Sequence, residues 1–412
     1  MVRRPWPIGW LRTVVVLMTD HSRRPLPSIL LFANSDWYLY NFRRSLALAL
    51  RQLGYDVLLV SPPGPYGEHL SAMGLRWQPL RMDRRSLNPL REILLLFRLV
   101  NVLRRTRPAL IHGFTIKCAI YSALAGKVAR VPARVASIEG LGFVFSSDRW
   151  LARGLRPVVG LLMRWALGGR AFRLILQNPD DVALFRCYGL TEAGGVRVIP
   201  GTGVDCTRFR PADVNSRGGA RRVLLASRLL WGKGIGEFVE AARLLRSEDG
   251  DVRFLVAGMP DAGNPDAIPS AQMRAWQDEG VIEWLGHVED MPALLRTVDV
   301  FVLPSRYGEG VPLSLVEAAA TGLALVTTDA PGCRDVVTHE VDGLLVPPRD
   351  SMAIAAAVRR LCHDDALRMM LGAKARAKAL ALFEAQAIIE QTLGVYEDVL
   401  CEAGCGRKDE QA

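Results

Sequence analysis

The chain has 412 residues, of which 50% are hydrophobic and 23% charged, so a disordered chain is excluded and two globular domains are favoured. The formal net charge of +10 is unevenly spread, because residues 1–210 carry 31 Lys and Arg against 12 Asp and Glu, whereas residues 211–412 carry 21 against 30. The basic half suits an anionic partner such as phospholipid, a lipid diphosphate or nucleic acid; the alternative is a solvated basic face without a partner.

The first predicted elements alternate between short apolar strands and helices, starting near Ser28. The predicted strands of this half are residues 29–33, 56–61, 109–112 and 133–138. The predicted helices are 38–53, which ends at Gly54, 90–105 and 116–129. This alternation predicts a parallel, doubly wound sheet.

A second α/β pattern follows a polar linker over residues 211–222. Its predicted strands are 223–226, 253–257, 281–285, 300–303, 324–327 and 343–346. Its predicted helices are 235–246, 271–280 and a long final helix over 373–400. Open α/β sheets bind ligands at the carboxyl ends of their strands, so we expect the site in a cleft between the two domains.

The chain shows no other strong signal before residue 28 or among its cysteines. No apolar run is long enough to span a bilayer, and the apolar stretch over residues 8–18 is broken by Arg12. Residues 1–27 are therefore either an interfacial anchor or an extension that does not fold. The seven cysteines include no C-x-x-C pair, which disfavours a zinc site or a disulfide framework.

The most informative segment covers residues 306–322, "RYGEGVPLSLVEAAATG". A glycine-containing loop leads to Pro312, which suits the first position of a helix. The start of that helix offers free N–H groups to an anion. Glu309 on the loop and Glu317 on the helix can face the same cleft and accept hydrogen bonds from sugar hydroxyls, although a loop carboxylate and a surface Glu would show the same spacing.

The second segment covers residues 226–242, "ASRLLWGKGIGEFVEAA". Arg228 and Lys233 bracket a glycine-containing loop that follows a strand and opens a helix. Cations beside such a helix start suit a diphosphate. The glycines do not have the G-x-G-x-x-G spacing of dinucleotide-binding folds, and no P-loop is present.

The Arg–Lys loop followed by E-x7-E at a loop–helix junction resembles family 4 of the retaining glycosyltransferases. Five further segments are similar to enzymes that build polysaccharide or lipid-linked oligosaccharide repeat units: residues 34–43, 60–77, 114–117, 139–145 and 280–292. The resemblance implies the GT-B fold, in which two Rossmann-like, doubly wound parallel-sheet domains face each other across a cleft. It also implies transfer of a hexose or N-acetylhexosamine from a UDP-sugar to an undecaprenyl-diphosphate-linked or saccharide acceptor, in polysaccharide, O-antigen or capsule biosynthesis.

With this resemblance, the chain divides into five parts. Residues 28–212 would form the acceptor and membrane-side domain, and residues 213–380 the domain that binds the nucleotide-sugar donor. A C-terminal helix over 381–400 can pack back on the first domain. Residues 1–27 form the extension described above, and residues 401–412 a disordered tail.

The resemblance implies roles for matching donor-side residues. Arg228 and Lys233 would hold the diphosphate and stabilise the charge that grows as the sugar leaves. Glu309 would bind the sugar hydroxyls and Glu317 the ribose. The loop backbone of Gly310, Val311, Pro312 and Leu313 would lie near the sugar and the phosphate. His287 and Val288 would contact the base. Such enzymes need no metal or other cofactor, and no Asp-x-Asp motif is present.

The acceptor side is less defined. Candidate residues there are Asn34, Arg43, His112, Lys117 and Glu139. His112 at the end of a strand would orient the acceptor, or it is a structural histidine. Many family members carry His where Glu139 falls in this chain, so Glu139 would bind an acceptor hydroxyl instead, and we name no general base.

Two segments suggest attachment to a membrane. Residues 90–107 and 150–173 place Leu, Phe and Trp beside arginines, as in helices that lie in a lipid interface, although core helices with solvated arginines show the same pattern. Together with the basic first half, they predict a peripheral location on the cytoplasmic face of the membrane, with no nucleic-acid partner.

Two other function classes remain open. A UDP-N-acetylglucosamine 2-epimerase can share the two-domain architecture but needs no acceptor. A non-catalytic basic protein that binds a membrane would use the first half, but it would leave the Arg–Lys loop and the spaced glutamates unexplained.

Overall fold

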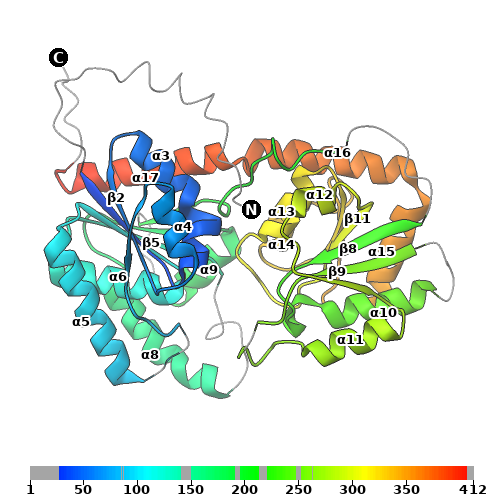
Figure 1. The fold of residues 1–412 in the computed structure, drawn as a ribbon, viewed down its shortest axis with the longest axis horizontal. Coiled ribbons are helices and arrows are strands. Elements are labelled where there is room, and N and C mark those ends of the chain that lie inside the picture. Colours follow the sequence, from blue (N-terminus) through cyan, green and yellow to red (C-terminus); the bar gives the residue numbers. More distant parts are fainter. Residues whose placement is uncertain are drawn as a thin grey trace, which may run out of the picture.

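The computed structural model describes residues 27–84, 86, 88–140, 150–190, 195–212, 220–246, 252–261 and 263–405. These residues form two lobes side by side, each with a parallel sheet between helices (Figure 1). The predicted pair of doubly wound domains is confirmed. The expectations for residues 1–26 and 406–412 lie outside the described residues. The predicted start of the disordered tail at residue 401 is wrong, because helix α17 (Ala385–Glu402) continues beyond it and Cys405 N donates to Leu400 O at 2.8 Å.

The sheet of the first lobe has seven strands in the order β3-β2-β1-β4-β5-β6-β7. Its strands are β1 (Ser28–Phe32), β2 (Asp56–Ser61), β3 (Arg76–Pro79), β4 (Leu110–Phe114), β5 (Ala133–Ile138), β6 (Phe172–Leu176) and β7 (Val196–Val198). Its helices are α2 (Asp36–Tyr38), α3 (Arg44–Gln52), α4 (Tyr66–Ala72), α5 (Pro89–Thr106), α6 (Ile116–Ala129), α8 (Trp150–Ala166) and α9 (Pro179–Cys187). All strand pairs are parallel. The five inner strands are almost continuously buried because helices cover both faces, whereas the edge strands β3 and β7 are partly exposed.

The sheet of the second lobe has six parallel strands in the order β10-β9-β8-β11-β12-β13. Its strands are β8 (Arg221–Ala226), β9 (Val252–Ala257), β10 (Glu283–Gly286), β11 (Val300–Leu303), β12 (Ala324–Thr328) and β13 (Leu344–Val346). Its helices are η2 (Trp231–Lys233), α10 (Ile235–Arg246), α11 (Ser270–Asp278), α12 (Met291–Leu295), α13 (Leu313–Ala320), α14 (Cys333–Val336), α15 (Ser351–His363) and α16 (Asp365–Leu382).

The predicted helix over residues 38–53 is not a regular α-helix. It begins with α2, continues as a π-helix (Leu39–Arg43) and becomes α-helical again in α3. A π-helical turn changes the direction in which side chains leave the helix. Here the turn ends at Arg43, whose side chain is buried.

The prediction of one final helix over residues 373–400 is wrong. The chain breaks after α16 and forms a separate helix, α17 (Ala385–Glu402). At the break, Val204 N donates to Phe383 O at 2.8 Å and Ala385 N donates to Val204 O at 3.0 Å, so contacts with a distant segment replace the helical ones.

Helix α17 returns to the first lobe and completes its core. Its buried residues Ile388, Val395, Tyr396 and Val399 join the hydrophobic cluster of the first sheet. Figure 1 shows α16 along the second lobe and α17 over the first. The two lobes are therefore joined by two chain crossings, one before β8 and one between α16 and α17.

Candidate functional site

A buried ion pair lies at the carboxyl ends of β8 and β11. Lys233, at the end of η2, contacts Glu309 Oε2, and each side chain is only 13% exposed. The other carboxylate oxygen accepts a hydrogen bond from Ser305 Oγ. The structure thus brings two of the predicted donor-site residues, 76 positions apart, into direct contact.

Two glycines allow the loop around η2 to approach the loop after β11. A Cβ on Gly232 would lie 1.8 Å from Cε1 of Tyr307, and a Cβ on Gly234 would lie 1.9 Å from the carbonyl oxygen of Pro304. Gly234 also has φ = 75°, in the left-handed region. These glycines are required by packing between the two loops, which in turn positions Lys233.

Arg228 lies at the more open edge of this site. Its guanidinium pairs with Asp261 at 3.0 Å, and its side chain is 61% exposed. The second oxygen of Asp261 pairs at 3.0 Å with Arg84, which comes from the loop after β3 in the first lobe. One carboxylate therefore joins two arginines from different lobes.

Tyr307, on the loop after β11, packs against Gly232 of the η2 loop. Burial raises its pKa to about 12, Glu309 and Asp266 add to the rise, and Arg228 opposes it. The phenol therefore stays protonated at neutral pH. These electrostatic effects show that Tyr307 lies near Glu309, Asp266 and Arg228.

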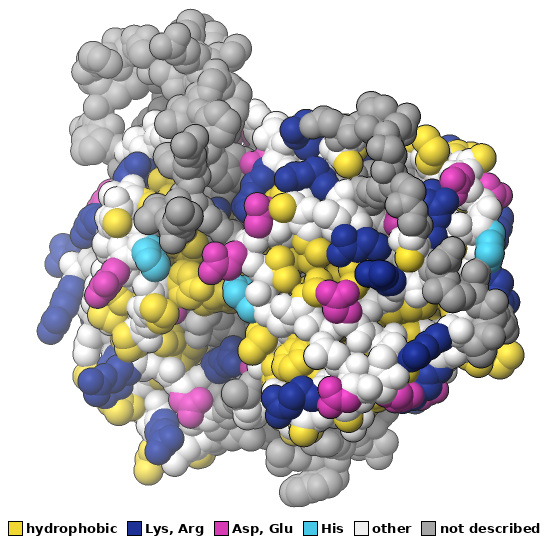
Figure 2. All heavy atoms as spheres, turned by 45° about the vertical axis from the view of Figure 1, so that its right-hand side comes forward, with side chains coloured by type: hydrophobic (Ala, Val, Ile, Leu, Met, Phe, Trp, Pro, Cys, Tyr) yellow, Lys and Arg dark blue, Asp and Glu magenta, His cyan; other side chains and the backbone are white. Residues whose placement is uncertain are grey.

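The first lobe holds the Glu309 loop from the opposite side. Gln177 Oε1 accepts from Val311 N at 2.7 Å, and Asn178 Nδ2 donates to Glu309 O at 3.0 Å. Both amide side chains are buried at the carboxyl end of β6. A Cβ on Gly140 would lie only 3.1 Å from Gly310 N, so a second loop of the first lobe also reaches this backbone. Figure 2 shows one face of the molecule, with hydrophobic side chains in its middle among acidic and basic ones.

Helix α13 starts one residue later than predicted. Pro312 is the N-cap with extended backbone (φ −67°, ψ 109°), and Leu313 is the first helical residue. The ψ of Pro312 lies outside the helical range, while its carbonyl accepts the first bonds of the helix, from Leu315 and Val316, as an N-cap carbonyl does. Glu317 lies half-buried in the second turn of α13. The two residues predicted to contact the nucleotide base follow β10: His287 is exposed, and Val288 packs against the core.

On the acceptor side, Glu139 and Arg43 form a buried pair with Tyr38. Glu139 Oε1 contacts Arg43 Nη2 and the Tyr38 hydroxyl, and Arg43 Nε donates to the same hydroxyl at 3.2 Å. Burial alone would lower the pKa of Arg43, but the two neighbours raise it. Glu139 comes directly before Gly140, so this network borders the Glu309 loop.

The other acceptor-side candidates are less close to the cleft. His112 is fully buried: Nδ1 lies 2.6 Å from the Tyr396 hydroxyl and Nε2 lies 2.7 Å from Ser137 Oγ. Burial lowers the pKa of His112, so the imidazole is neutral and structural, and it has no nitrogen left for an acceptor. Lys117 Nζ donates to Glu92 Oε1 at 2.9 Å and to the carbonyl oxygen of Asp83 at 2.8 Å. Asn34 is half-buried and follows β1.

Two family models match the chain, one in each lobe. The model described as "Glycosyl transferase 4-like" matches residues 28–178, and the one described as "Glycosyl transferases group 1" matches residues 220–364. The chain belongs to the GT-B glycosyltransferases.

Two relatives of this glycosyltransferase are named for lipid-linked sugars. The N,N'-diacetylbacillosaminyl-diphospho-undecaprenol alpha-1,3-N-acetylgalactosaminyltransferase of Campylobacter jejuni is 29% identical over 373 residues, 88% of this chain and 96% of that protein. The UDP-Gal:alpha-D-GlcNAc-diphosphoundecaprenol alpha-1,3-galactosyltransferase of Escherichia coli is 28% identical, over 69% of this chain and 74% of that protein.

Solved structures show the same fold. A glycosyltransferase from Rickettsia africae has a TM-score of 0.74 at 16% identity, covering 92% of this chain and 99% of that one. Anabaena Alr3699/HepE in complex with UDP-glucose has a TM-score of 0.73 at 20% identity, covering 90% of this chain and 100% of that one.

Several residues of the candidate site were missed by the sequence analysis: Arg84, Gln177, Asn178, Asp261, Ser305 and Tyr307. One signal was available, because "LQNPD" has an apolar strand end followed by Asn and Pro, as at a helix N-terminus. In the structure Asn178 is indeed the N-cap of α9, accepting from Asp181 N at 2.7 Å.

Proposed function

We propose that this glycosyltransferase retains the anomeric configuration and moves a hexose or N-acetylhexosamine from a UDP-sugar to an undecaprenyl-diphosphate-linked acceptor. The pathway would be that of a polysaccharide, O-antigen or capsule. The single observation that carries the proposal is the Lys233–Glu309–Ser305 contact beside the start of α13, with Arg228 at its open edge. Relatives with lipid-diphosphate acceptors support the acceptor class.

Each site residue has a chemical task in this proposal. Arg228, Lys233 and the first amides of α13 would neutralise the leaving diphosphate, whose negative charge grows as the glycosidic bond breaks. Glu309 would accept hydrogen bonds from the donor sugar. In the ligand-free protein Lys233 and Glu309 neutralise each other, so a donor would insert between them and give each a new partner. As in the resembling family, a donor phosphate oxygen would take the acceptor proton.

Basic side chains would take the place of a metal ion in this reaction. Within the described ranges, no three His, Cys, Asp or Glu side chains are grouped as metal ligands. We therefore expect transfer to be unchanged by EDTA, and a loss of activity that Mg²⁺ or Mn²⁺ restores would contradict this part of the proposal.

The acceptor would reach the enzyme from the cytoplasmic face of the membrane. In the described part of the chain, no helix is long and apolar enough to cross a bilayer. Instead, α5 exposes Leu90, Ile93 and Phe97, and α8 exposes Leu161 and Trp165. Figure 1 shows both helices on the same edge of the first lobe. Apolar side chains beside arginines suit peripheral binding to anionic lipid.

The test is a transfer assay with a panel of UDP-sugars and a diphosphate-linked acceptor. Glu309→Ala should reduce turnover by about 100-fold or more, since a contact made near the reacting sugar is lost. Glu240→Ala is a matched control, because Glu240 is an exposed carboxylate of the same lobe paired with Arg243. An active Glu309→Ala enzyme would refute the site, and rapid isomerisation of the UDP-sugar without acceptor would indicate an epimerase.

A further inference from the structure

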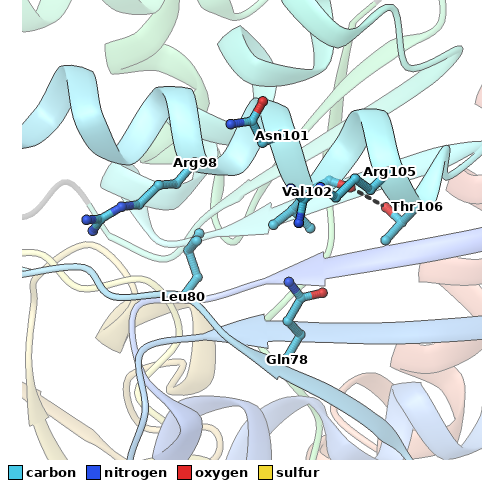
Figure 3. A pocket seen from close by; sticks show the side chains of 7 residues that line it. All are labelled: Gln78, Leu80, Arg98, Asn101, Val102, Arg105 and Thr106. Carbon is cyan, nitrogen blue, oxygen red and sulfur yellow. Dashed lines mark hydrogen bonds between the residues drawn. The ribbon is translucent and has the colours of Figure 1, made fainter.

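A pocket of about 260 Å³ lies away from the cleft, between the edge strand β3 and helix α5. Figure 3 shows Arg98, Asn101 and Arg105 on α5 above Gln78 and Leu80. The polar lining therefore consists mainly of two guanidinium groups and two carboxamides, and no carboxylate lines the pocket. Such a set of hydrogen-bond donors suits an anion with several oxygens, such as a phosphate.

The two arginines of the pocket lack internal partners. Among the described residues, the side chain of neither Arg98 nor Arg105 forms a hydrogen bond or an ion pair. Glu92, the only acidic residue of α5, instead pairs with Lys117 at 2.9 Å and accepts a hydrogen bond from the Tyr121 hydroxyl at 2.8 Å. Since Arg98 and Arg105 are seven residues apart, they lie two helical turns apart on one face, about 10 Å along the axis. Their charge is available for a ligand.

The same face of α5 becomes apolar towards its N-terminus. Leu90 is 77% exposed and Phe97 is 60% exposed, with Ile93 and Leu94 beside them. Helical spacing places Leu94 next to Arg98 and Phe97 next to Asn101. The outward face is therefore mainly apolar in its first two turns, where Arg91 is the one exposed cation, and cationic in the next two. This order matches a ligand with an acyl chain and an anionic head.

We propose that this pocket binds the phosphate headgroup of an anionic membrane phospholipid, while Leu90, Ile93, Leu94 and Phe97 enter the acyl layer. The proposal rests on the peripheral attachment proposed above and deepens it, because it replaces a general basic surface with one defined site. Charge complementarity and the adjoining apolar face favour a lipid over a soluble phosphate ester. The strand that lines the pocket leads into the loop of Arg84, so a bound lipid would lie on the same segment that reaches Asp261 in the cleft.

The experiment measures sedimentation of the full-length protein with phosphatidylglycerol–phosphatidylcholine vesicles and with phosphatidylcholine vesicles alone. The variant Arg98→Gln/Arg105→Gln removes the pocket charges. The control Arg104→Gln/Arg186→Gln removes two exposed arginines of the first lobe that do not line the pocket. The pocket variant should bind anionic vesicles about tenfold or more weaker, and the control variant less than about threefold weaker.

Three results would overturn the proposal. The first is that wild-type protein does not prefer anionic vesicles. The second is that the two double variants lose vesicle binding equally. The third is that glycerol 1-phosphate binds at the pocket while the protein does not bind vesicles. Transfer to a water-soluble acceptor analogue is measured in parallel. If the pocket variant keeps full transfer but the vesicle result fails, only the lipid site is wrong; if wild-type protein shows no transfer, the proposed function itself fails.

Discussion

The variant Asp261→Asn is expected to strengthen UDP binding, although it removes no group from the proposed diphosphate site. In the ligand-free protein Asp261 pairs with Arg228 at 3.0 Å and with Arg84 at 3.0 Å. A diphosphate that binds Arg228 must compete with this carboxylate. Asparagine keeps the size of the side chain and an acceptor oxygen for Asn264, but not the charge.

The magnitude follows from the exposure of the pair. Because Arg228 is 61% exposed, solvent screens the ion pair, and pairs of this kind contribute about 0.2–1 kcal/mol. Releasing that competition corresponds to an affinity about 1.4- to 5-fold higher. Titration calorimetry with UDP at low salt would measure it, and the gain should shrink as salt rises.

Asp365→Asn provides a matched control. Asp365 is also shared by two arginines, Arg221 at 2.7 Å and Arg368 at 2.6 Å, but it lies at the start of α16. This control should leave UDP affinity unchanged. Weaker or equal UDP binding by Asp261→Asn, or the same gain with Asp365→Asn, would refute the reasoning, because Arg228 would then not be the group that the diphosphate meets.

Three further outcomes are expected. Gln177→Ala leaves Val311 N without its acceptor, which should lower the free energy of unfolding in urea by about 1–3 kcal/mol and reduce turnover as the Glu309 loop loosens; wild-type values for both would contradict the clamp. Tyr396→Phe removes the hydroxyl at His112 Nδ1, and a loss of about 1–3 kcal/mol is expected in the same measurement. Burial lowers the pKa of His112, so below pH about 6.5 the unfolded chain gains a proton that the folded protein does not. The free energy of unfolding should therefore decrease as the pH is lowered below about 6.5. The share of this decrease that is due to His112 should disappear in His112→Gln.

The fold could be predicted from sequence where local pattern decides the structure. Helix α6 and strand β5 have the predicted limits, 116–129 and 133–138, because an apolar run or a helical period ends there at a clear boundary. The break at Phe383 could not be predicted in this way. It depends on Val204, which lies far away in the sequence.

The same distinction applies to the site. The contact of Lys233 with Glu309 agrees with the grouping expected from the two segments, since both follow strands whose carboxyl ends meet at one edge. Their roles with substrate stay predictions. The amides Gln177 and Asn178 were missed because their partners are backbone atoms of the other lobe, which leave no pattern in the sequence. From its place at a strand end, His112 was a candidate for orienting the acceptor, but Tyr396 of α17 packs against it.

The return of α17 means that the second lobe is inserted into the first. Tyr396, which satisfies His112, lies 284 residues further along the chain. During synthesis, the first lobe therefore lacks part of its core until the entire second lobe has emerged, and its apolar face must stay uncovered or be protected meanwhile. A nascent chain stalled after α16 would carry a complete donor lobe beside an unfinished partner, and hydrogen exchange at β4 and β5 should remain fast until α17 docks.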